Sequence, residues 1–437
     1  MSFLQNQLSR IESPLIRRIA GGAFWAIFGT ATAKAFIMIS GIICAHILGV
    51  SLYGELGLVR STLNMFIIFG SVGMGVTATK YVAQNLKENK EKVEKICAVT
   101  TAFAIVTAVL VALIIFFLAP FIVDTAVRID EVTTEIRIGT IILFATILNG
   151  AVNGILVGFE GFKNIAINTF ISSIVESVLI IAFAELWGVM GALVGYGIGT
   201  FTLLLLNFRS AHGFYNKNGL QLSYLKLRVS DFKVLYKFSL PAALSSFLVT
   251  PSFWITRTMI VKYNGFEELG IYEAADQWKV IILFLPAALS QIVLPILSSN
   301  LSKDHRSDYW SALKVNMKLN GGITLIFSII VSAISPWLIG LYGDGFTNFL
   351  PIIFLSFSTV FSSMATVLGM AIISREKVWY GLGFNLLWAC MFTYGSYIAL
   401  NLGFGVTGVS IVLMGSYMAH TIFQGSFLYI NRKKLSE

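Results

Sequence analysis

Charged residues are scarce in this chain, making up 12% of its 437 residues, whereas hydrophobic residues make up 56%. The mean hydropathy is +0.81. Soluble domains carry about 25% charged residues, so this composition excludes a soluble globular protein. It indicates a protein that crosses a membrane many times.

Cysteine and histidine are also rare, with 3 and 4 residues in the chain. Cys44, Cys97 and Cys390 lie in or beside different apolar runs, so we interpret them as core residues rather than disulfides. The histidines are equally scattered, and we predict no metal site or cofactor. No GxxxxGK followed by Ser or Thr occurs, which excludes ATP hydrolysis by a phosphate loop. Transport would then use an ion gradient, a substrate gradient or removal of the product outside.

The apolar residues form runs of about 20, the length that crosses a bilayer core of about 30 Å. Six runs precede a polar, basic segment at residues 207–237 and six follow it. We predict an all-α polytopic membrane protein with about 12 transmembrane helices in two pseudo-symmetric six-helix lobes. The lobes are residues 1–208 and 239–437, joined by a basic cytoplasmic linker at 209–238. The predicted spans are 20–46, 56–82, 96–118, 136–158, 165–185, 190–208, 239–262, 271–298, 319–341, 348–373, 380–401 and 405–430.

The two halves are interpreted as copies of one unit. At an offset of about 216 residues, several landmarks coincide in order along the chain, as expected of an internal repeat. Repeated halves joined by a cytoplasmic loop are common in membrane transporters. The coinciding pairs are Gly54 with Gly270, Pro120 with Pro336, Gly188 with Gly405 and Gly191 with Gly408, the last two within one residue.

The positive charge predicts the topology. Most of the 31 Lys and Arg lie in the termini, in the central segment and after the even-numbered predicted helices. By the positive-inside rule these segments and both termini face the cytoplasm. The net charge of +9 is therefore mostly topological, and nucleic acid is not an expected partner. The short outer loops leave no room for an extracytoplasmic catalytic domain, so we do not expect an enzyme.

Four cations fall inside predicted helices, namely Lys34, Arg60, Arg257 and Lys279. An ionised side chain at mid-bilayer costs about 2.5–3.5 kcal/mol on insertion scales, so such residues usually face a watery cavity or a charged partner. Helix phase places Lys34 and Arg257 on inward faces, opposite bulky apolar residues. The duplication predicts that their two helices face each other across the pseudo-two-fold axis.

Two interpretations of these charges stay open. Cations lining a cavity would select an anion, and phosphate suits both Arg and Lys. Alternatively, Asp276 and Lys279 neutralise each other at i, i+3 spacing. Lys34 and Arg257 would then form structural ion pairs with Glu176, Glu273 or Asp276.

A recognisable pattern starts at ILGVSLYGELGLVRS, residues 47–61, and continues in the glycine-rich FGSVGMGVTATKYVAQ. It resembles the polysaccharide-exporter (Wzx-type, O-antigen flippase) branch of the multidrug/oligosaccharidyl-lipid/polysaccharide exporter superfamily, and the likeness covers essentially the whole chain. The resemblance implies two lobes around a cationic central cavity lined largely by helices 1, 2, 7 and 8, with rocker-like alternating access.

The cargo implied by the resemblance is an undecaprenyl-diphosphate-linked oligosaccharide, turned from the inner to the outer leaflet of a bacterial plasma membrane. The four cations would bind its diphosphate or acidic sugars. Exchange of H⁺ or Na⁺ is also implied, with Glu55 and Glu176 as candidate coupling residues and Glu273 and Asp276 as further coupling residues or charge partners.

Three rival interpretations remain. The first is a multidrug or metabolite exporter of the same fold. The second is a membrane enzyme such as an O-antigen polymerase or ligase, which the short outer loops disfavour. The third is an additional role as a scaffold that binds other glycan-assembly proteins. Membrane lipids are expected partners in every case.

Overall fold

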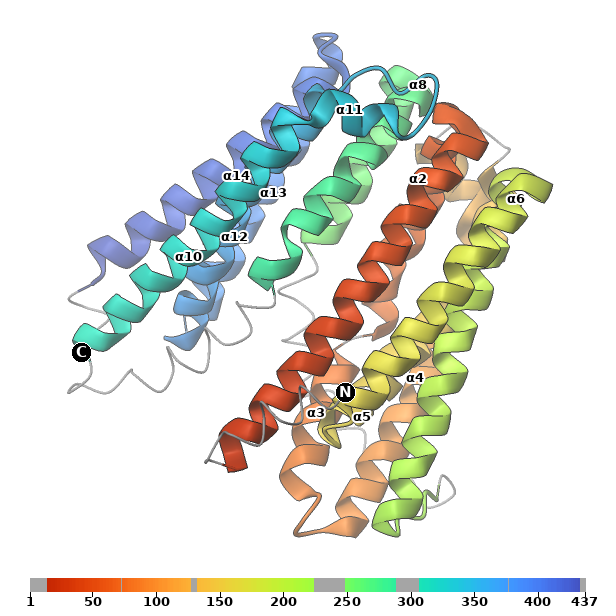
Figure 1. The fold of residues 1–437 in the computed structure, drawn as a ribbon, viewed down its shortest axis with the longest axis vertical. Helices are drawn as coiled ribbons and strands as arrows, with labels where there is room; N and C mark the ends of the chain where they lie inside the picture. Colours follow the sequence, from red (N-terminus) through yellow and green to blue (C-terminus); the bar gives the residue numbers. More distant parts are fainter. Residues whose placement is uncertain are drawn as a thin grey trace. The chain divides into compact units, whose positions relative to one another are not determined.

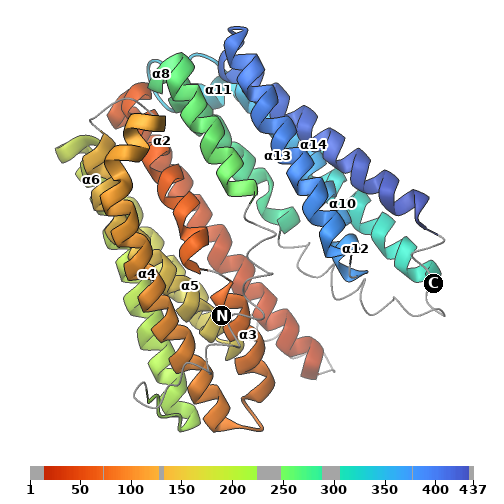
Figure 2. The same cartoon turned by 180° about the vertical axis from the view of Figure 1, so that it is seen from behind.

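The computed structural model describes residues 14–71, 73–126, 132–223, 248–287, 306–375 and 377–432. In these ranges the chain is helical with short connections (Figures 1 and 2). The helices are α2 (Pro14–Ser71), α3 (Met74–Asn85), α4 (Lys90–Ala126), α5 (Val132–Gly158), α6 (Phe162–Asn218), α8 (Val249–Ile282), α10 (Arg306–Ala333), α11 (Ser335–Gly340), α12 (Leu350–Ser374), α13 (Val378–Asn401) and α14 (Gly405–Ile430).

Kinks divide the longest helices. Gly49 in α2 has φ 76° and Gly265 in α8 has φ 86°, values that residues with a β-carbon rarely adopt. The same offset that aligns the two halves of the sequence separates these glycines, so the kink itself is duplicated. A third kink lies at Trp187 and Gly188 in α6.

The kinks reconcile the helices with the predicted spans. Within the described residues, 7 helices are long and apolar enough to cross a membrane. The 57-residue α6 holds two predicted spans, and the 58-residue α2 holds one span and the first part of the next. Ten of the predicted spans fall on one helix each, whereas 56–82 is divided between α2 and α3 and 319–341 between α10 and α11. Residue 72 and parts of 239–262 and 271–298 lie outside the described residues. The all-α fold with about 12 spans is confirmed.

The helices form two compact units. Unit 1 comprises Met1–Gly41, Thr62–Ile122 and Asp130–Leu244, and unit 2 comprises Ile42–Ser61, Val123–Ile129 and Ser245–Glu437. Residues 42–61 thus pack with the C-terminal half of the sequence. Of the predicted linker, the part up to Asn218 continues α6 as helix, and residues 224–238 lie outside the described residues.

Small and amide side chains hold unit 1 together. In this unit α3 packs on α5, and α5 packs on α6. A β-carbon added to Gly154 would lie only 2.4 Å from Cα of Gly75, so the backbones of α3 and α5 touch. Between α5 and α6, Asn207 donates to Asn149 Oδ1 at 2.7 Å and accepts from Asn168 Nδ2 at 2.8 Å. These buried amides satisfy one another where water is excluded.

Unit 2 has an aromatic core. Here α12 packs against α10 and α14, α13 packs against α14, and α8 contacts α12 and α13. Trp388, Phe392 and Tyr272 are almost completely buried in this core. Hydroxyl groups join α10 to α12, for example Ser328, which donates to the carbonyl of Ser356 at 2.7 Å.

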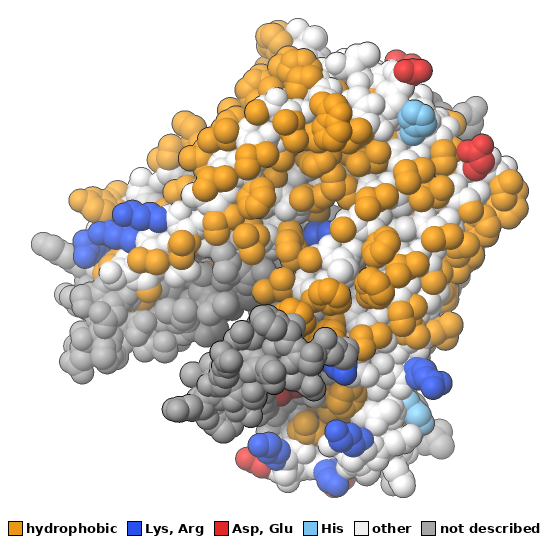
Figure 3. Space-filling view, viewed as in Figure 1, with side chains coloured by type: hydrophobic (Ala, Val, Ile, Leu, Met, Phe, Trp, Pro, Cys, Tyr) orange, Lys and Arg blue, Asp and Glu red, His pale blue; other side chains and the backbone are white. Residues whose placement is uncertain are grey.

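Apolar side chains cover the described surface that Figure 3 shows, while Lys, Arg, Asp and Glu gather mainly toward helix ends. Phe117, Phe121 and Leu205 are each more than 65% exposed. A water-soluble protein rarely exposes so much continuous apolar surface. This surface is suited to lipid.

Candidate functional site

The candidate site begins where two equivalent half-helices cross inside unit 2. They are the parts of α2 and α8 that follow the kinks at Gly49 and Gly265. A β-carbon on Gly54 would lie 2.1 Å from the carbonyl oxygen of Phe266, and one on Gly270 would lie 2.0 Å from the carbonyl oxygen of Val50. Both pairs match at the repeat offset, so the contact is reciprocal, as in a contact across a two-fold axis. Glycine at both positions is what allows the backbones to touch.

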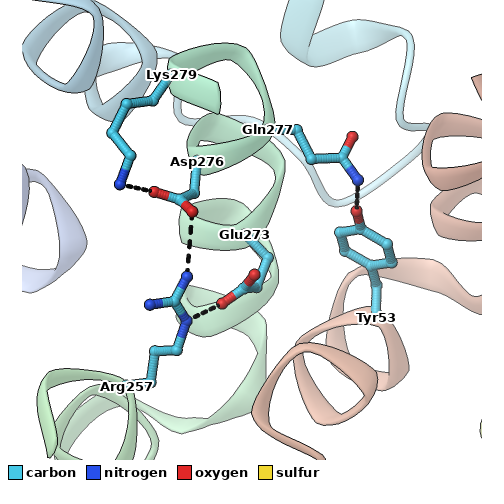
Figure 4. A network of polar contacts seen from close by, with 6 residues as sticks. All are labelled: Tyr53, Arg257, Glu273, Asp276, Gln277 and Lys279. Carbon is cyan, nitrogen blue, oxygen red and sulfur yellow. Dashed lines mark hydrogen bonds and ion pairs between the residues drawn. The ribbon is translucent and has the colours of Figure 1, made fainter. Parts of the chain in front are cut away.

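Next to this crossing, α8 carries a cluster of four charged side chains (Figure 4). Arg257 lies on the arm before the kink, and Glu273, Asp276 and Lys279 lie on the arm after it. Arg257 Nε donates to Glu273 Oε1, and Arg257 Nη2 donates to Asp276 Oδ2 at 3.2 Å. Lys279 Nζ forms an ion pair with Asp276 Oδ1. The kink at Gly265 lets one helix fold its two arms together so that Arg257 reaches both carboxylates.

The cluster is formally neutral and well shielded from solvent. It contains two cations and two carboxylates, whose side chains are 10% exposed for Arg257 and Lys279, 17% for Glu273 and 15% for Asp276. Phe253 lies beneath Lys279, with Nζ 4.6 Å from the ring centroid. Pairing with charge and with an aromatic face offsets the desolvation of these groups.

A glycine on α2 makes room for one of the carboxylates. A β-carbon added to Gly57 would lie 2.4 Å from Cγ of Glu273. Any larger residue at this position would displace Glu273 from Arg257. Gly57 itself is not repeated, because the offset that aligns the two halves places Glu273 at the equivalent position.

A chain of neutral hydrogen bonds joins the crossing to the segment before α12. Gln277 Nε2 donates to the hydroxyl of Tyr53, and the Tyr342 hydroxyl donates to Gln277 Oε1 at 2.9 Å. Burial raises the pKa of Tyr342, so its phenol keeps its proton and stays a donor. The sequence interpretation missed Gln277 and Tyr342. The signal for Gln277 was its position one turn after Glu273, on the polar face of α8.

The other predicted site residues are half-buried and lie elsewhere. Lys34 is in unit 1, where it forms no hydrogen bond or ion pair with any described residue. Glu176 is also in unit 1, packed against Gly199, whose added β-carbon would lie 2.3 Å from its Cβ. Glu55 and Arg60 are in unit 2, and Arg60 lies within electrostatic range of Tyr53.

The structure thus brings together half of the predicted site. For Arg257 and Lys279, the ion-pair alternative left open by the sequence is the arrangement observed. Lys34 does not pair with Glu176, because Lys34 has no partner in the described part of the chain. Lys34 and Arg257 belong to different units, so their facing across the pseudo-two-fold axis stays a prediction. Binding of cargo by the four cations stays a prediction too. Across the described ranges, no group of His, Cys, Asp and Glu side chains is arranged to hold a metal ion.

Comparison with known sequences identifies relatives in polysaccharide export. A family model described as polysaccharide biosynthesis protein matches residues 19–301. The EPS I polysaccharide export inner membrane protein EpsE of Ralstonia solanacearum is 22% identical over 406 residues, covering 91% of this chain and 90% of the relative. The lipid III flippase of Escherichia coli is 22% identical over 288 residues, covering 64% of this chain and 67% of the relative.

Comparison with solved structures identifies the fold. A multidrug resistance MATE family transporter of the MOP superfamily in its inward-facing conformation superposes with a TM-score of 0.77 at 15% identity, covering 94% of this chain and 98% of the other. A MOP superfamily transporter from Pyrococcus furiosus, described as having a binding pocket of reverse polarity, gives 0.70 at 16% identity and covers 96% of both chains. The family model confirms the resemblance to polysaccharide exporters that was stated from the sequence, and the solved structures show that the chain shares their fold.

Proposed function

Because the chain belongs to the polysaccharide biosynthesis protein family, we propose that it is a flippase for an undecaprenyl-diphosphate-linked oligosaccharide repeat unit of O-antigen or a related surface polysaccharide. It moves this cargo from the inner to the outer leaflet of a bacterial plasma membrane by alternating access. It acts as a transporter and not as an enzyme, with both termini in the cytoplasm.

The observation that carries this proposal is the buried charge cluster beside the symmetric helix crossing. Intramembrane charges are costly and generally mark the path of a charged substrate or ion. Arg257 is held by two carboxylates, each of which occupies a position that a phosphate oxygen would fill. In the proposed mechanism the diphosphate of the cargo replaces Glu273 and Asp276 as the partner of Arg257 and Lys279.

This exchange links binding to movement. Arg257 ties the arm of α8 before Gly265 to the arm after it. When a diphosphate binds Arg257, the bonds from Arg257 to Glu273 and Asp276 are broken. The two arms of α8 can then change their angle at the kink. Protonation of Glu273 and Asp276, or Na⁺ binding to them, would release Arg257 in the same way, which makes these carboxylates candidates for ion coupling alongside Glu55 and Glu176.

Lys34 is the proposed first contact for the cargo. It is half-buried, and no described carboxylate compensates its charge. A buried cation without a partner favours an anionic ligand, because binding removes an unfavourable desolvated charge. Arg60, on the half-helix of unit 2 that carries Gly54, is a further proposed contact for the diphosphate.

A second candidate function is export of a cationic drug or metabolite. Glu273 and Asp276 would attract such a compound if Arg257 and Lys279 moved away. The two functions differ in the charge of the cargo, so the same variants separate them.

The test uses purified protein in vesicles that contain a fluorescent undecaprenyl-diphosphate-linked saccharide, with leaflet exposure read by an impermeant quencher. We expect the wild type to equilibrate the lipid between leaflets, and Lys34→Ala and Arg257→Ala to slow this at least tenfold, which is about 1.4 kcal/mol in the barrier. Lys262→Ala, which removes an exposed cation from α8, is the matched control and should resemble wild type.

In cells, the wild type should restore surface glycan to a flippase-null strain that carries the matching glycan locus. The variants Lys34→Ala and Arg257→Ala are compared with it at equal membrane abundance. Failure of the wild type in both assays, together with efflux of an organic cation such as ethidium, would establish the second candidate instead.

A further inference from the structure

Unit 2 contains a cavity of about 370 Å³ between α8, α12, α13 and α14. This volume lies within the roughly 300–1,000 Å³ typical of small-molecule pockets and far exceeds that of a single water site. Its polar lining comes from Ser362, Ser363, Thr366, Asn385, Tyr417, His420 and Gln424. The cavity is separate from the Arg257 cluster, and nothing in the proposed mechanism uses it.

Two polar atoms of side chains that line this cavity have no hydrogen-bond partner in the part of the chain that the structure describes. His420 and Gln424 are 7% and 3% exposed. Their side chains meet each other at 2.9 Å between Gln424 Nε2 and His420 Nε2, yet His420 Nδ1 and Gln424 Oε1 find no hydrogen-bond partner among the described residues. Buried polar groups are rarely left unpaired, because each costs about 1–3 kcal/mol.

The chemistry of the two atoms defines what would satisfy them. An amide nitrogen can only donate, so Gln424 Nε2 donates to His420 Nε2. A neutral imidazole that accepts at Nε2 carries its proton on Nδ1, so Nδ1 is an unused donor, while Gln424 Oε1 is an unused acceptor. The cavity lining therefore offers one donor and one acceptor on two neighbouring side chains. A hydroxyl group, or a pair of adjacent hydroxyls, accepts from the first and donates to the second.

The remaining lining favours a neutral ligand. The described lining residues include no Asp, Glu, Lys or Arg. Among these described residues, a phosphate would find no cation and a metal ion would find no carboxylate. The hydroxyls of Ser362 and Thr366 already donate to backbone carbonyls of α12 at 3.3 and 2.9 Å, so their oxygens remain free to accept from a ligand hydroxyl. Tyr417 adds an aromatic wall against which the C–H face of a sugar ring packs well.

We propose that this cavity is a binding subsite for a neutral sugar ring of the glycan cargo. The link to cargo rests on the proposed function, whereas sugar binding itself does not. Packed aromatic rings connect the cavity to the charge cluster. The ring centroids of Tyr417 and Trp388 are 5.0 Å apart, and those of Trp388 and Phe253 are 5.7 Å apart. Phe253 is the ring that lies beneath Lys279. A sugar that packs against Tyr417 would therefore contact the same set of aromatic rings that Lys279 contacts.

The experiment measures binding of the methyl glycosides of glucose, galactose and N-acetylglucosamine to the purified full chain in lipid nanodiscs, by saturation-transfer NMR. We expect at least one glycoside to bind the wild type. Gln424→Leu should weaken it at least about fivefold, because a ligand hydroxyl loses its acceptor. Gly369→Val should weaken it similarly while keeping every polar group, since its side chain would project toward Gln424 Nε2, which lies 4.0 Å from an added β-carbon.

His212→Leu is the matched control, because His212 is an exposed histidine of α6 in unit 1, and it should bind as the wild type does. Unfolding temperatures measured on each variant show whether the fold is kept. The proposal is overturned if no glycoside binds the wild type, or if Gly369→Val binds as well as wild type. It is also overturned if no glycoside binds but ²³Na relaxation shows Na⁺ binding in the cavity, and if this Na⁺ binding is lost in Gln424→Leu.

The vesicle assay separates this inference from the proposed function. Glycoside binding without movement of the lipid-linked saccharide would support the subsite and refute the flippase. Movement of the lipid without glycoside binding would support the flippase and refute the subsite.

Discussion

The pairing of Arg257 with Glu273 allows its structural and its transport role to be separated. Arg257→Gln removes one charge-assisted hydrogen bond to Glu273 and another to Asp276. Asp276 keeps Lys279 as its partner, so the carboxylate left uncompensated is that of Glu273, whose side chain is 17% exposed. Breaking a buried pair from one side costs about 3–5 kcal/mol, so we expect a loss of stability of that order.

The double variant Arg257→Gln/Glu273→Gln should recover most of this loss. It removes both charges and leaves the Asp276–Lys279 pair, so the cluster is again neutral. We expect a net cost of no more than about 1–2 kcal/mol and a coupling energy of about 2–3 kcal/mol between the two sites. Unfolding in mixed micelles, followed by tryptophan fluorescence, gives the four stabilities of the cycle.

The vesicle assay on the same double variant then tests the transport role. A stable but inactive double variant would show that the charge of Arg257 is needed for cargo and not only for folding. Additive stabilities, with no coupling between the sites, would refute the reasoning, because the two side chains would then not be paired in the working protein. A stable and fully active double variant would restrict both residues to a structural role.

Three further predictions concern other parts of the chain. Lys34→Gln should change the free energy of unfolding by less than about 0.5 kcal/mol, because Lys34 has no partner among the described residues. It should nevertheless slow lipid transport at least tenfold in the vesicle assay. A large loss of stability would contradict this prediction. Gly54→Val should sharply reduce the yield of folded protein in size-exclusion chromatography, because its β-carbon would lie 2.1 Å from a backbone carbonyl oxygen. Gly383→Ala is the control and should leave the yield unchanged, because a β-carbon at Gly383 has no atom within 4 Å. A fluorescent-protein fusion at the C-terminus should fluoresce and an alkaline phosphatase fusion at Gly343 should be active, with the reverse result overturning the predicted topology.

The sequence predicted the fold for reasons that act locally. Lipid offers no hydrogen bonds, so each apolar run of sufficient length must form a helix whatever its neighbours do. Glycines such as Gly54 and Gly270 also revealed the duplication, because a close helix crossing tolerates little else. Their direct contact follows from the symmetry that the repeat implies, although the sequence alone did not identify them as the point of contact.

The state of the charges depended on the tertiary structure. Helix phase placed Arg257 on an inward face, and it is 8% exposed, but phase does not show what lies opposite. The kink at Gly265 folds the two arms of α8 together, and Gly57 of α2 leaves space for Glu273, so Arg257 and Lys279 meet carboxylates rather than an open cationic cavity. Similarly, His420 and Gln424 carry no pattern that sets them apart in the sequence.

By itself, the sequence determined that this is an all-helical membrane protein with a repeated glycine pattern, because hydropathy and glycine spacing are properties of the chain alone. Only the tertiary structure decided which charges neutralise one another and which polar atoms face a cavity without a partner. The pairing of charges and the hydrogen bonding of polar atoms both depend on distances between side chains on helices that kinks and crossings bring together. A carboxylate a few ångströms away is enough to place a cation in an ion pair.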